Sequence, residues 1–481
     1  MQTFDVVVVG AGPGGYVAAI RASQLGFKVA VIEREFLGGV CLNVGCIPSK
    51  AMITASHLLH KAQHDFPTMG LKIKGPIEVD MKQLLKWKTS VCDRMATGVG
   101  TLLKGNNVTV LRGDASFKNS KELEIKMSTG GSETVSAKFF VIATGSRPIE
   151  IPGFKYDEKD IMSSTGALAL DHVPKRIVVI GGGYIGLEIS SYLRKLGSEV
   201  TVVEAQTQLL AGVVDPECAQ VVVRKLEKSG VKIIYGGKSK SQKKISSGYE
   251  VTIEKDGKDE VIKCDKILVT VGRKPNGDQM NLKAAGIQTD ARGFVTVDAQ
   301  RRTSIQNIFA IGDICGQPML AHKASYEGVM VAEIMKGMNR AYDAKTVPAV
   351  VFTDPEIASA GLLESEARAK GFNDLKISKF PFAANGRAVS MSETDGFVKM
   401  IADSKTGLLL GIHIVGPEAS NLISEAVLAI EMGARLEDIA LSIHPHPTLG
   451  ETMMEAAEAT LGHAIHIIQK PLNTNAKSAH P

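Results

Sequence analysis

The sequence predicts an α/β fold with two Rossmann-like dinucleotide-binding domains and a C-terminal α+β domain. The main observation is a repeat: one segment occurs twice in register, and each copy places a G-x-G-x-x-G fingerprint between an apolar strand and a helix. From about residue 346 the strand and helix patterns continue without a fingerprint, which predicts a separate domain at that end.

The first copy covers residues 6–33 and begins with the apolar run VVVV. We expect a strand, a glycine turn, a helix and a second strand that ends at Glu33. Gly10 would make the tight turn, Gly12 would let the backbone approach a pyrophosphate, and Gly15 would let the helix pack on the strand. The phosphates are expected at the helix N-terminus, and Glu33 is expected to accept hydrogen bonds from a ribose.

The second copy covers residues 177–204. Its residues Gly181, Gly183, Gly186 and Glu204 have the same spacing as the three fingerprint glycines and the final glutamate of the first copy, without a gap. A single fingerprint can be an ordinary glycine-rich turn, but two complete copies predict two bound dinucleotides. The residues after Glu204 are Ala-Gln-Thr-Gln, which offer no arginine for a 2′-phosphate, and the carboxylate itself would repel that group. NAD is therefore favoured over NADP at this copy.

Cys41 and Cys46 lie close together in GGVCLNVGCIPSK, whereas the other four cysteines stand alone. This spacing can bring the two Cα atoms within the roughly 4.4–6.8 Å of a disulfide, provided that the flanking glycines distort the start of a helix. The alternatives are two structural thiols or half of a zinc site, but zinc needs two more nearby Cys or His ligands, so no metal site is expected. A close pair in a reducing compartment is more often catalytic, which predicts a redox pair served by one flavin and one nicotinamide. Lys50 lies either near the flavin or on a solvent-exposed helix face, and the residues alone favour neither.

Two near-copies of another pattern, KFFVIATGSRP at 138–148 and KILVTVGRKP at 266–275, mark the places where the chain leaves each dinucleotide-binding domain. They predict that the second of these domains is inserted into the first. We expect an FAD-binding domain from 1–149 and 278–345, an inserted NAD-binding domain at 150–277, a C-terminal dimerisation domain at 346–470 and a flexible tail at 471–481.

The composition argues against several classes of partner. The net charge is only +5 and the Lys and Arg residues are scattered, without a basic stripe interleaved with aromatics, so nucleic acid is not expected as a partner. No apolar run approaches the roughly 18 residues that suggest a membrane span. The N-terminus enters a strand pattern at once, which predicts a cytoplasmic or matrix-like location.

Eight blocks resemble the FAD-dependent pyridine nucleotide disulfide oxidoreductases, from Phe4 to about Leu472. The blocks are GAGPGG, GGVCLNVGCIPSK, ATGSRP, GGGYIGLE, VGRKPN, IFAIGD, LAHKASYEG and HPHPTLGE. The resemblance implies FAD in the first repeat, NAD in the second and an obligate homodimer. The blocks are most similar to members that oxidise protein-bound dihydrolipoamide with NAD. Those members dock to the acyltransferase core of 2-oxo acid dehydrogenase complexes or serve the lipoyl protein of glycine cleavage.

The resemblance also implies the roles of the residues around the cysteines. Cys41 would be the thiol that exchanges with the substrate, and Cys46 would be the thiolate next to the flavin. Lys50 would lie near the flavin and pair with Glu188, the last residue of GGGYIGLE.

The C-terminal block HPHPTLGE would supply the catalytic base. The resemblance assigns this role to His446, which would reach the cysteines of the other subunit, and Glu451 would orient it. However, Thr448 and Glu451 also form the pattern of a capping box, which predicts a helix over 452–461. Both interpretations can hold, although one carboxylate cannot fully serve two donors. His444 is interpreted as a packing residue or a secondary polar contact.

Further residues are implied to bind the cofactors. Asp313 would hold the ribityl chain of the flavin, and the helix after Leu320 would direct its dipole at the pyrimidine edge. Tyr184, where a smaller aliphatic side chain is common, is hypothesised to be a lid over the flavin that swings aside for the nicotinamide. The full set of expected cofactor-binding residues is Gly10, Gly12, Pro13, Gly14, Gly15, Glu33, Arg34, Gly39, Lys50, Gly113, Ala115, Thr144, Gly145, Ser146, Gly181, Gly183, Tyr184, Ile185, Gly186, Glu188, Glu204, Gly272, Arg273, Gly312, Asp313, Met319, Leu320, Ala321 and His322.

Two other functions remain open. One is another disulfide reductase of the same architecture, although the last cysteine is Cys315, so the chain has no redox pair near its C-terminus, and no NADP-binding arginine follows Glu204. The other is a flavin-binding scaffold that senses redox state. Such a scaffold would lack one or more of the residues Cys41, Cys46, His446 and Glu451. All four are present, which favours an enzyme.

Overall fold

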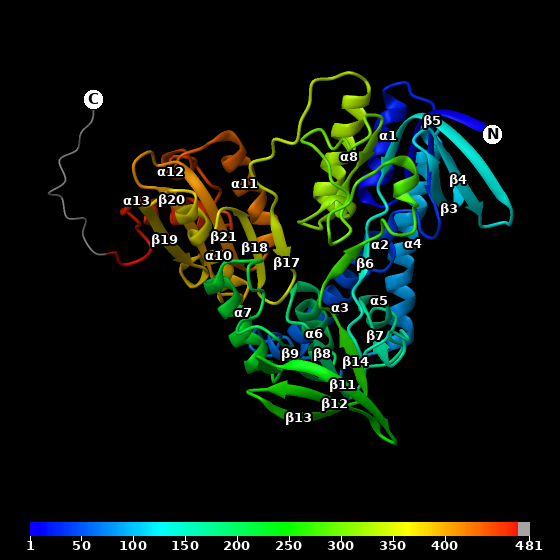
Figure 1. Cartoon of the computed structure of the whole chain (residues 1–481). Coiled ribbons are helices and arrows are strands. Elements are labelled where there is room, and N and C mark those ends of the chain that lie inside the picture. The colour runs from blue at the N-terminus through cyan, green and yellow to red at the C-terminus, as the bar shows by residue number, and fades with distance from the viewer. Residues whose placement is uncertain (470–481) are drawn as a thin grey trace, which may run out of the picture.

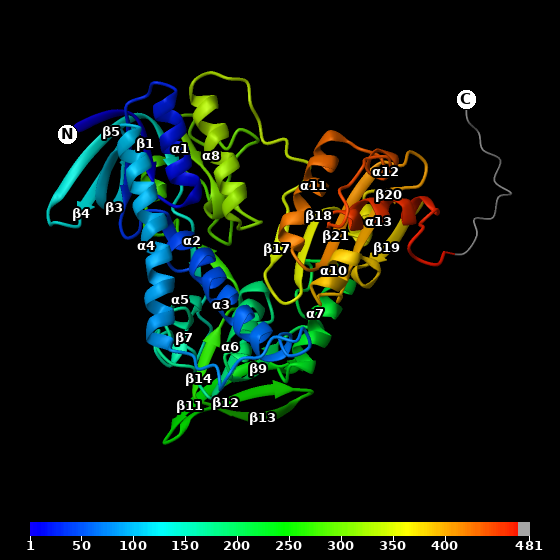
Figure 2. The same cartoon turned by 180° about the vertical axis from the view of Figure 1, so that it is seen from behind.

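The structure is a computed structural model that describes residues 1–469, and it forms three lobes, each built on one main sheet (Figure 1). Figures 1 and 2 show the first and third lobes side by side with the second lobe beneath both. The expected tail, residues 471–481, lies outside the described residues.

The first lobe contains a sheet of six strands. Strands β3, β2, β1, β5 and β16 are parallel neighbours in that order, and β4 pairs antiparallel with both β3 and β5. Strand β16 joins this sheet although it follows the whole second lobe in the sequence. The strands are β1 (Gln2–Val9), β2 (Val29–Glu33), β3 (Thr109–Asn119), β4 (Glu122–Met127), β5 (Ser132–Ile142) and β16 (Ile308–Ala310).

Helices cover this sheet, and α1 packs against α8. The helices and 3-10 turns of the lobe are α1 (Pro13–Gln24), α2 (Gly39–Asn43), α3 (Cys46–His64), α4 (Met81–Gly105), α8 (Ala321–Met335), η1 (Leu282–Ala285) and η2 (Gly312–Cys315). The predicted strand–turn–helix–strand order of the first repeat is confirmed by β1, α1 and β2. Gly15 is needed for the close packing of α1 on β1, because a Cβ there would lie 1.8 Å from the carbonyl oxygen of Gly10.

The second lobe repeats this plan with β8, α6 and β9. Its five strands are all parallel in the order β10, β9, β8, β14 and β7, and a three-stranded antiparallel sheet of β11, β12 and β13 lies beside them. The elements are β7 (Ile161–Met162), α5 (Ser164–Ala167), β8 (Arg176–Ile180), α6 (Tyr184–Lys195), β9 (Glu199–Glu204), α7 (Pro216–Lys228), β10 (Lys232–Tyr235), β11 (Lys238–Ile245), β12 (Gly248–Lys255), β13 (Lys258–Cys264) and β14 (Lys266–Val269).

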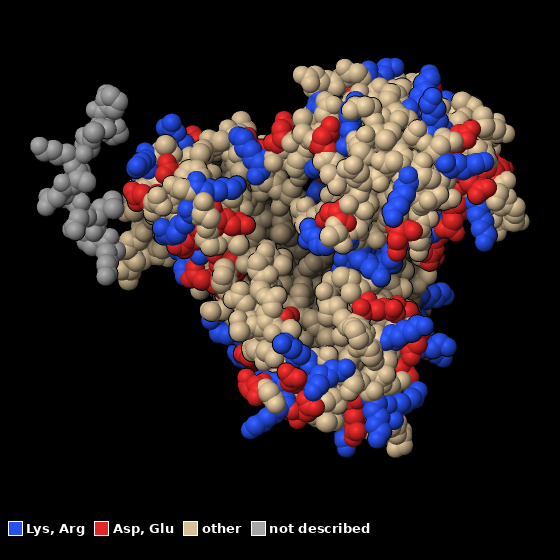
Figure 3. All heavy atoms as spheres, in the orientation of Figure 1, with Lys and Arg blue, Asp and Glu red and all other residues tan. Residues whose placement is uncertain are grey.

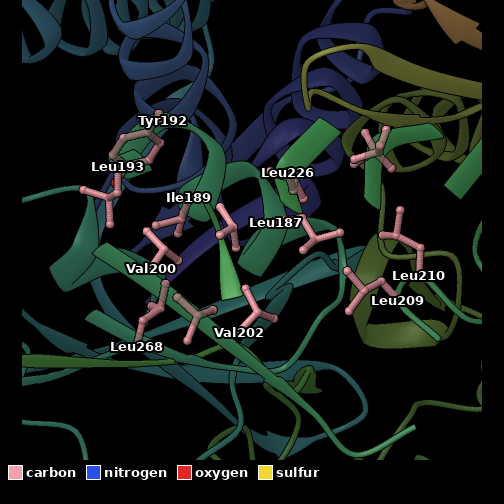
Figure 4. Packing of buried hydrophobic residues seen from close by; sticks show 14 of the residues in the cluster. Leu187, Ile189, Tyr192, Leu193, Val200, Val202, Leu209, Leu210, Leu226 and Leu268 are labelled. Atoms are coloured by element: carbon pink, nitrogen blue, oxygen red, sulfur yellow. The ribbon is translucent and has the colours of Figure 1, made fainter. Parts of the chain in front are cut away.

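The core of the second lobe fixes the rotation of α6. Leu187 and Ile189 of this helix are buried in one cluster with Val200, Val202 and Leu268 of the sheet (Figure 4). Each such side chain contributes about 1.5–3 kcal/mol when it is fully buried. Because Leu187 and Ile189 are both fully buried, Glu188 between them on α6 is held in a fixed direction.

Two short strands join the first and second lobes. Strand β6 (Ser146–Pro148) pairs antiparallel with β15 (Arg273–Pro275). The Nε atom of Arg273 donates to Oγ of Ser146 over 2.7 Å. These strands come from the two near-copies found in the sequence, so the segments that leave the two domains lie against each other.

The third lobe is an antiparallel sheet in the order β17, β18, β21, β20 and β19, with helices against it. Strand β21 is buried along its whole length, since it lies at the centre of this sheet. The elements are β17 (Ala349–Val351), β18 (Glu356–Gly361), α9 (Glu364–Ala369), β19 (Leu375–Pro381), η3 (Phe382–Ala384), α10 (Gly386–Ser390), β20 (Phe397–Asp403), β21 (Leu409–Gly416), α11 (Ala419–Met432), α12 (Leu436–Ala440) and α13 (Glu451–Leu461).

One face of the molecule carries both signs of charge (Figure 3). On the face shown in Figure 3, Lys and Arg side chains alternate with Asp and Glu side chains over all three lobes. Within residues 1–469, no helix is both long enough and apolar enough to span a membrane. The same residues contain no cluster of three or more His, Cys, Asp or Glu side chains that could hold a metal ion.

Candidate active site

Cys41 and Cys46 lie on either side of a break between two helices. Cys41 is in α2, and Cys46 is the first residue of α3. Gly45 precedes α3, and a Cβ there would lie 2.9 Å from the carbonyl oxygen of Val40, so the close return of the chain requires a glycine. This distorted helix start brings the two thiols close enough for each to shift the pKa of the other.

The two thiols differ in acidity. The hydrogen bond from Cys41 and the charge of Lys50 lower the pKa of Cys46 to about 7, although burial and the Glu188 carboxylate oppose this shift. The same hydrogen bond, together with burial, raises the pKa of Cys41. The reduced pair therefore carries its negative charge on Cys46 near neutral pH, and the thiolate is the reactive form of a cysteine.

Lys50 lies one turn after Cys46 on α3. Its Nζ atom is 2.8 Å from Oε2 of Glu188, and the Glu188 side chain is only 6% exposed. The same Nζ lies 4.2 Å from the centroid of the Phe352 ring. The structure thus favours an ion-paired Lys50 over a solvent-exposed one, and it shows the expected contact with Glu188.

A cavity of about 1350 Å³, partly open to solvent, extends from the first fingerprint to the cysteine pair. Cys41, Cys46 and most of the expected cofactor-binding residues line it. The expected residues in this cavity are Gly10, Gly12, Pro13, Gly14, Glu33, Arg34, Gly39, Lys50, Thr144, Gly145, Ser146, Tyr184, Ile185, Glu188, Arg273, Gly312, Asp313, Met319 and Ala321. A neighbouring cavity continues past Glu33 and contains Gly113 and Ala115.

A further cavity, of about 1570 Å³, lies at the second fingerprint. It contains the expected residues Gly181, Gly183, Glu204 and Gly272. Tyr184 lines this cavity as well as the first one, so its side chain lies where the two meet. Burial raises the pKa of the Tyr184 hydroxyl to about 12, so the side chain is neutral. The hypothesis that it acts as a lid stays a prediction.

Four expected residues do not line these cavities. Gly15 and Gly186 instead allow α1 and α6 to pack closely on their strands, because a Cβ at Gly186 would lie 2.2 Å from the carbonyl oxygen of Gly181. The other two are Leu320 and His322, at the start of α8. The Nε2 atom of His322 is 2.9 Å from the carbonyl oxygen of Pro348, so this ring faces the segment before β17.

Among the helices that begin at the cavities without a side-chain cap are α1 after Gly12, α6 after Gly183 and α8 at Ala321. Their free N–H groups and dipoles favour anions. A Cβ at Gly12 or Gly183 would have no neighbour within 4 Å, so both glycines leave room for a ligand. The carboxylates of Glu33 and Glu204 are held at the same turns, where they accept the N–H groups of Ala11 and Gly182. These features fit the pyrophosphate and ribose groups of two dinucleotides.

His446 and Glu451 form a pair in the third lobe. Nδ1 of His446 is 2.8 Å from Oε1 of Glu451, and Oε2 of the same carboxylate accepts the N–H of Thr448 over 2.8 Å. The His446 ring is 79% exposed and does not line the cavity of the cysteines in the same chain. His444 makes a separate contact, with Nε2 2.9 Å from Oε1 of Glu425.

The capping-box interpretation is only half right. Helix α13 begins at Glu451, one residue before the expected start, and Gly450 is its N-cap. The Thr448 hydroxyl donates to the carbonyl oxygen of Pro445, and its oxygen does not accept the backbone N–H of Glu451 as a capping box requires. The Glu451 carboxylate does serve both donors, since each of its oxygens accepts one hydrogen bond.

Comparison with known proteins places these features in a family. The family model for pyridine nucleotide-disulphide oxidoreductases matches residues 4–328, and the model for the dimerisation domain of the same family matches residues 347–457. The chain belongs to the pyridine nucleotide-disulphide oxidoreductases. It is therefore an oxidoreductase, its expected cofactors FAD and NAD are those of the family, and the dimerisation domain indicates a homodimer.

Several relatives of this oxidoreductase are similar over almost their whole length. The chain is 48% identical to dihydrolipoyl dehydrogenases of Geobacillus stearothermophilus and Bacillus subtilis, over 97% of this chain and 98% of each relative. Among solved structures, LpdA of Mycobacterium tuberculosis matches with a TM-score of 0.88 at 26% identity, over 95% of this chain and 99% of that one. The HOCl-induced flavoprotein disulfide reductase RclA of Escherichia coli matches with a TM-score of 0.82 at 27% identity, over 93% and 98%.

Asn276 and Phe352 are among the residues of this oxidoreductase's site that sequence reasoning missed. Asn276 lines the first cavity and donates through Nδ2 to the carbonyl oxygen of Thr144. Its place directly after the second near-copy could have indicated it. Phe352 contacts the Lys50–Glu188 pair from the third lobe, and no motif marks it.

Proposed function

We propose that this oxidoreductase converts dihydrolipoamide to lipoamide with NAD as the electron acceptor. The observation that carries the proposal is the Cys41–Cys46 pair, which faces the first cavity with Lys50 and Glu188 beside it. The similarity to dihydrolipoyl dehydrogenases over almost the whole chain supports the choice of substrate.

The reaction begins with the cysteine pair as a disulfide. His446 of the partner subunit accepts a proton from one thiol of dihydrolipoamide, and the resulting thiolate attacks Sγ of Cys41. An S–S bond forms between substrate and Cys41, the Cys41–Cys46 bond breaks, and Cys46 leaves as a thiolate. The second substrate thiol attacks the substrate sulfur of the mixed disulfide, the bond between this sulfur and Cys41 breaks, and Cys41 leaves and takes up the proton that the second thiol loses. Lipoamide is released, and the pair of cysteines has gained two electrons.

Side chains of the protein stabilise each charge that develops during this reaction. The Lys50 ammonium and the Cys41 thiol stabilise the Cys46 thiolate. Glu451 fixes His446 with Nδ1 as the donor, because an ionised carboxylate can only accept, and Nε2 is left free to take the substrate proton. When bound, FAD accepts the two electrons and NAD receives them as hydride.

The physiological partner is part of the same proposal. Lipoyl domains and the acyltransferase core of a 2-oxo acid dehydrogenase complex, or the lipoyl protein of glycine cleavage, would present the dihydrolipoyl group. A cytoplasmic location and the domain boundaries given above also stay predictions.

The test is turnover of the purified holoenzyme with dihydrolipoamide and NAD, followed by the formation of NADH. We expect rapid turnover, none in Cys41→Ser or Cys46→Ser, and normal FAD retention in both variants. Turnover with other dithiols but not with dihydrolipoamide would support a related disulfide reductase. FAD binding without turnover on any dithiol would support the redox-sensing scaffold.

A further inference from the structure

Three lobes meet beside the cysteine pair at one ion pair. Lys50 comes from α3 of the first lobe and Glu188 from α6 of the second. Phe352 follows β17 of the third lobe, and its backbone N–H donates to Oε1 of Glu188 over 3.0 Å. The other oxygen, Oε2, holds Lys50. Glu188 is thus fixed from two directions, which leaves it only 4% exposed.

The Phe352 ring also contacts the cation of this pair. Nζ of Lys50 lies 4.2 Å from the ring centroid, a distance typical of a cation–π interaction. Phe352 does not line the cavity of the cysteines, so its ring contacts Lys50 from outside that cavity. The ring therefore shields the ammonium from water on one side and limits its movement.

The same loop makes a second contact two helical turns further along both helices. Oδ2 of Asp354 is 2.6 Å from Nζ of Lys195 on α6 and 3.4 Å from Nδ1 of His57 on α3. The residues 352–354 of the third lobe thus hold α3 against α6 at two levels. Of these two contacts, only the one made by Phe352 is next to the cysteines.

We propose that Phe352 is a positioning residue, which holds the Lys50 ammonium in a partly dehydrated position from which its charge acts on Cys46. The third lobe then influences both thiols: it presents His446 to Cys41 of the partner subunit, as proposed above, and it supports Lys50 beside Cys46 of its own subunit. The inference rests on the proposed function only for the redox role of Cys46, because the effect on the thiol itself is independent of the substrate.

The measurable consequence is the acidity of Cys46. The charged or titratable groups that act on this thiol include Cys41 on α2, Lys50 on α3, and Glu188 and Tyr184 on α6. Lys50 lowers the pKa of Cys46, and a hydrated, mobile ammonium would do so less strongly, since water screens its charge. Loss of the Phe352 ring should therefore raise the pKa of Cys46.

The experiment uses the full-length holoenzyme with Cys41→Ser in all samples, so that Cys46 is the single thiol of the pair. The rate of iodoacetamide labelling of the Cys46 peptide is measured by mass spectrometry as a function of pH. Phe352→Leu is compared with Phe352→Tyr, which keeps the ring, and with Phe397→Leu. Phe397 is a matched control, because its ring lies 5.3 Å from Lys379 in the same lobe and away from the cysteines.

We expect Phe352→Leu to raise the apparent pKa of Cys46 by about 0.5 or more, and the two comparison variants to leave it unchanged. An unchanged profile in Phe352→Leu would overturn the inference, as would an equal shift in Phe397→Leu, which would point to general loosening of the lobe. Failure of turnover with dihydrolipoamide would instead count against the proposed function, because the labelling profile needs no turnover.

Discussion

The Glu451 carboxylate holds His446 through one oxygen and the Thr448 backbone through the other. Although burial opposes it, the hydrogen bonds from Thr448 and His446 lower the pKa of Glu451, so the group is ionised and accepts both. The ring is therefore oriented by a residue that is itself tied to the turn before α13.

Replacing Glu451 by Gln should impair catalysis without unfolding the protein. An amide that keeps the Thr448 bond turns its NH2 group towards Nδ1 of His446 and favours the wrong tautomer. We expect kcat for dihydrolipoamide oxidation to fall about 10²-fold or more, with little change in Tm. Glu425→Gln is the matched control, since Glu425 pairs with His444 in the same way. An equal loss of kcat in both variants would show that the His446–Glu451 pair has no special role.

Removing the Cys41 thiol should make Cys46 a weaker acid. The hydrogen bond from Cys41 is the largest cause of the low pKa of Cys46, about 7, whereas burial acts in the opposite direction. In Cys41→Ala we expect the pH profile of Cys46 alkylation to move upward, towards or beyond the ordinary value of 9.0. Cys92→Ala should leave the profile unchanged. A Cys46 profile that stays near pH 7 in Cys41→Ala would contradict the assignment.

His57 should make stability depend on pH in the neutral range. Hydrogen bonds with Asp354 and Glu393 raise its pKa above the ordinary 6.5. The protonated ring therefore contributes stability that is fully present below about pH 6.5 and is lost as the pH rises through the higher pKa of the folded chain. In His57→Gln, Tm should lose this part of its pH dependence, as measured by calorimetry from pH 6 to 9. Identical slopes for the two proteins would exclude the effect.

Substitutions at the glycines of the first fingerprint should have two different effects, one on stability and one on FAD binding. Gly15→Ala places a Cβ 1.8 Å from the carbonyl oxygen of Gly10 and should destabilise the protein by about 1–3 kcal/mol or more. Gly12→Ala meets no protein atom within 4 Å, so the apoprotein should keep its Tm but bind FAD more weakly. Thermal unfolding and flavin fluorescence measure the two effects. A Gly12→Ala variant with normal FAD affinity would argue against a phosphate site at α1.

Replacing Tyr184 should change the kinetic constants for NAD but not the acidity of the cysteine thiols. Its side chain lines both cavities, so under the lid hypothesis Tyr184→Ile removes the group that would move when the nicotinamide binds. We expect the kinetic constants for NAD to change while the alkylation profile of Cys46 stays the same. Unchanged NAD kinetics in Tyr184→Ile would eliminate the lid hypothesis.

The sequence predicts the parts of this site that depend on local patterns. Gly10 to Glu33 and Gly181 to Glu204 have a fixed spacing that follows from the backbone geometry of a strand, a turn and a helix. The contact of Phe352 with Lys50 could not be predicted, because it depends on how the third lobe packs against the first two. The expected cap by the Thr448 hydroxyl was wrong for a local reason that the residue pattern does not reveal, because this hydroxyl donates to the carbonyl oxygen of Pro445 three residues earlier.

The antiparallel pairing of β6 and β15 has a consequence for protein engineering. The chain departs for the second lobe and comes back from it at two hydrogen-bonded positions, so the ends of the first lobe's segments are already adjacent. Both covalent connections to the second lobe therefore meet at one place, although α6 of this lobe also packs against α3 and the third lobe. A lobe with another nucleotide preference could be grafted at this junction if it keeps the face of α6 that makes these contacts.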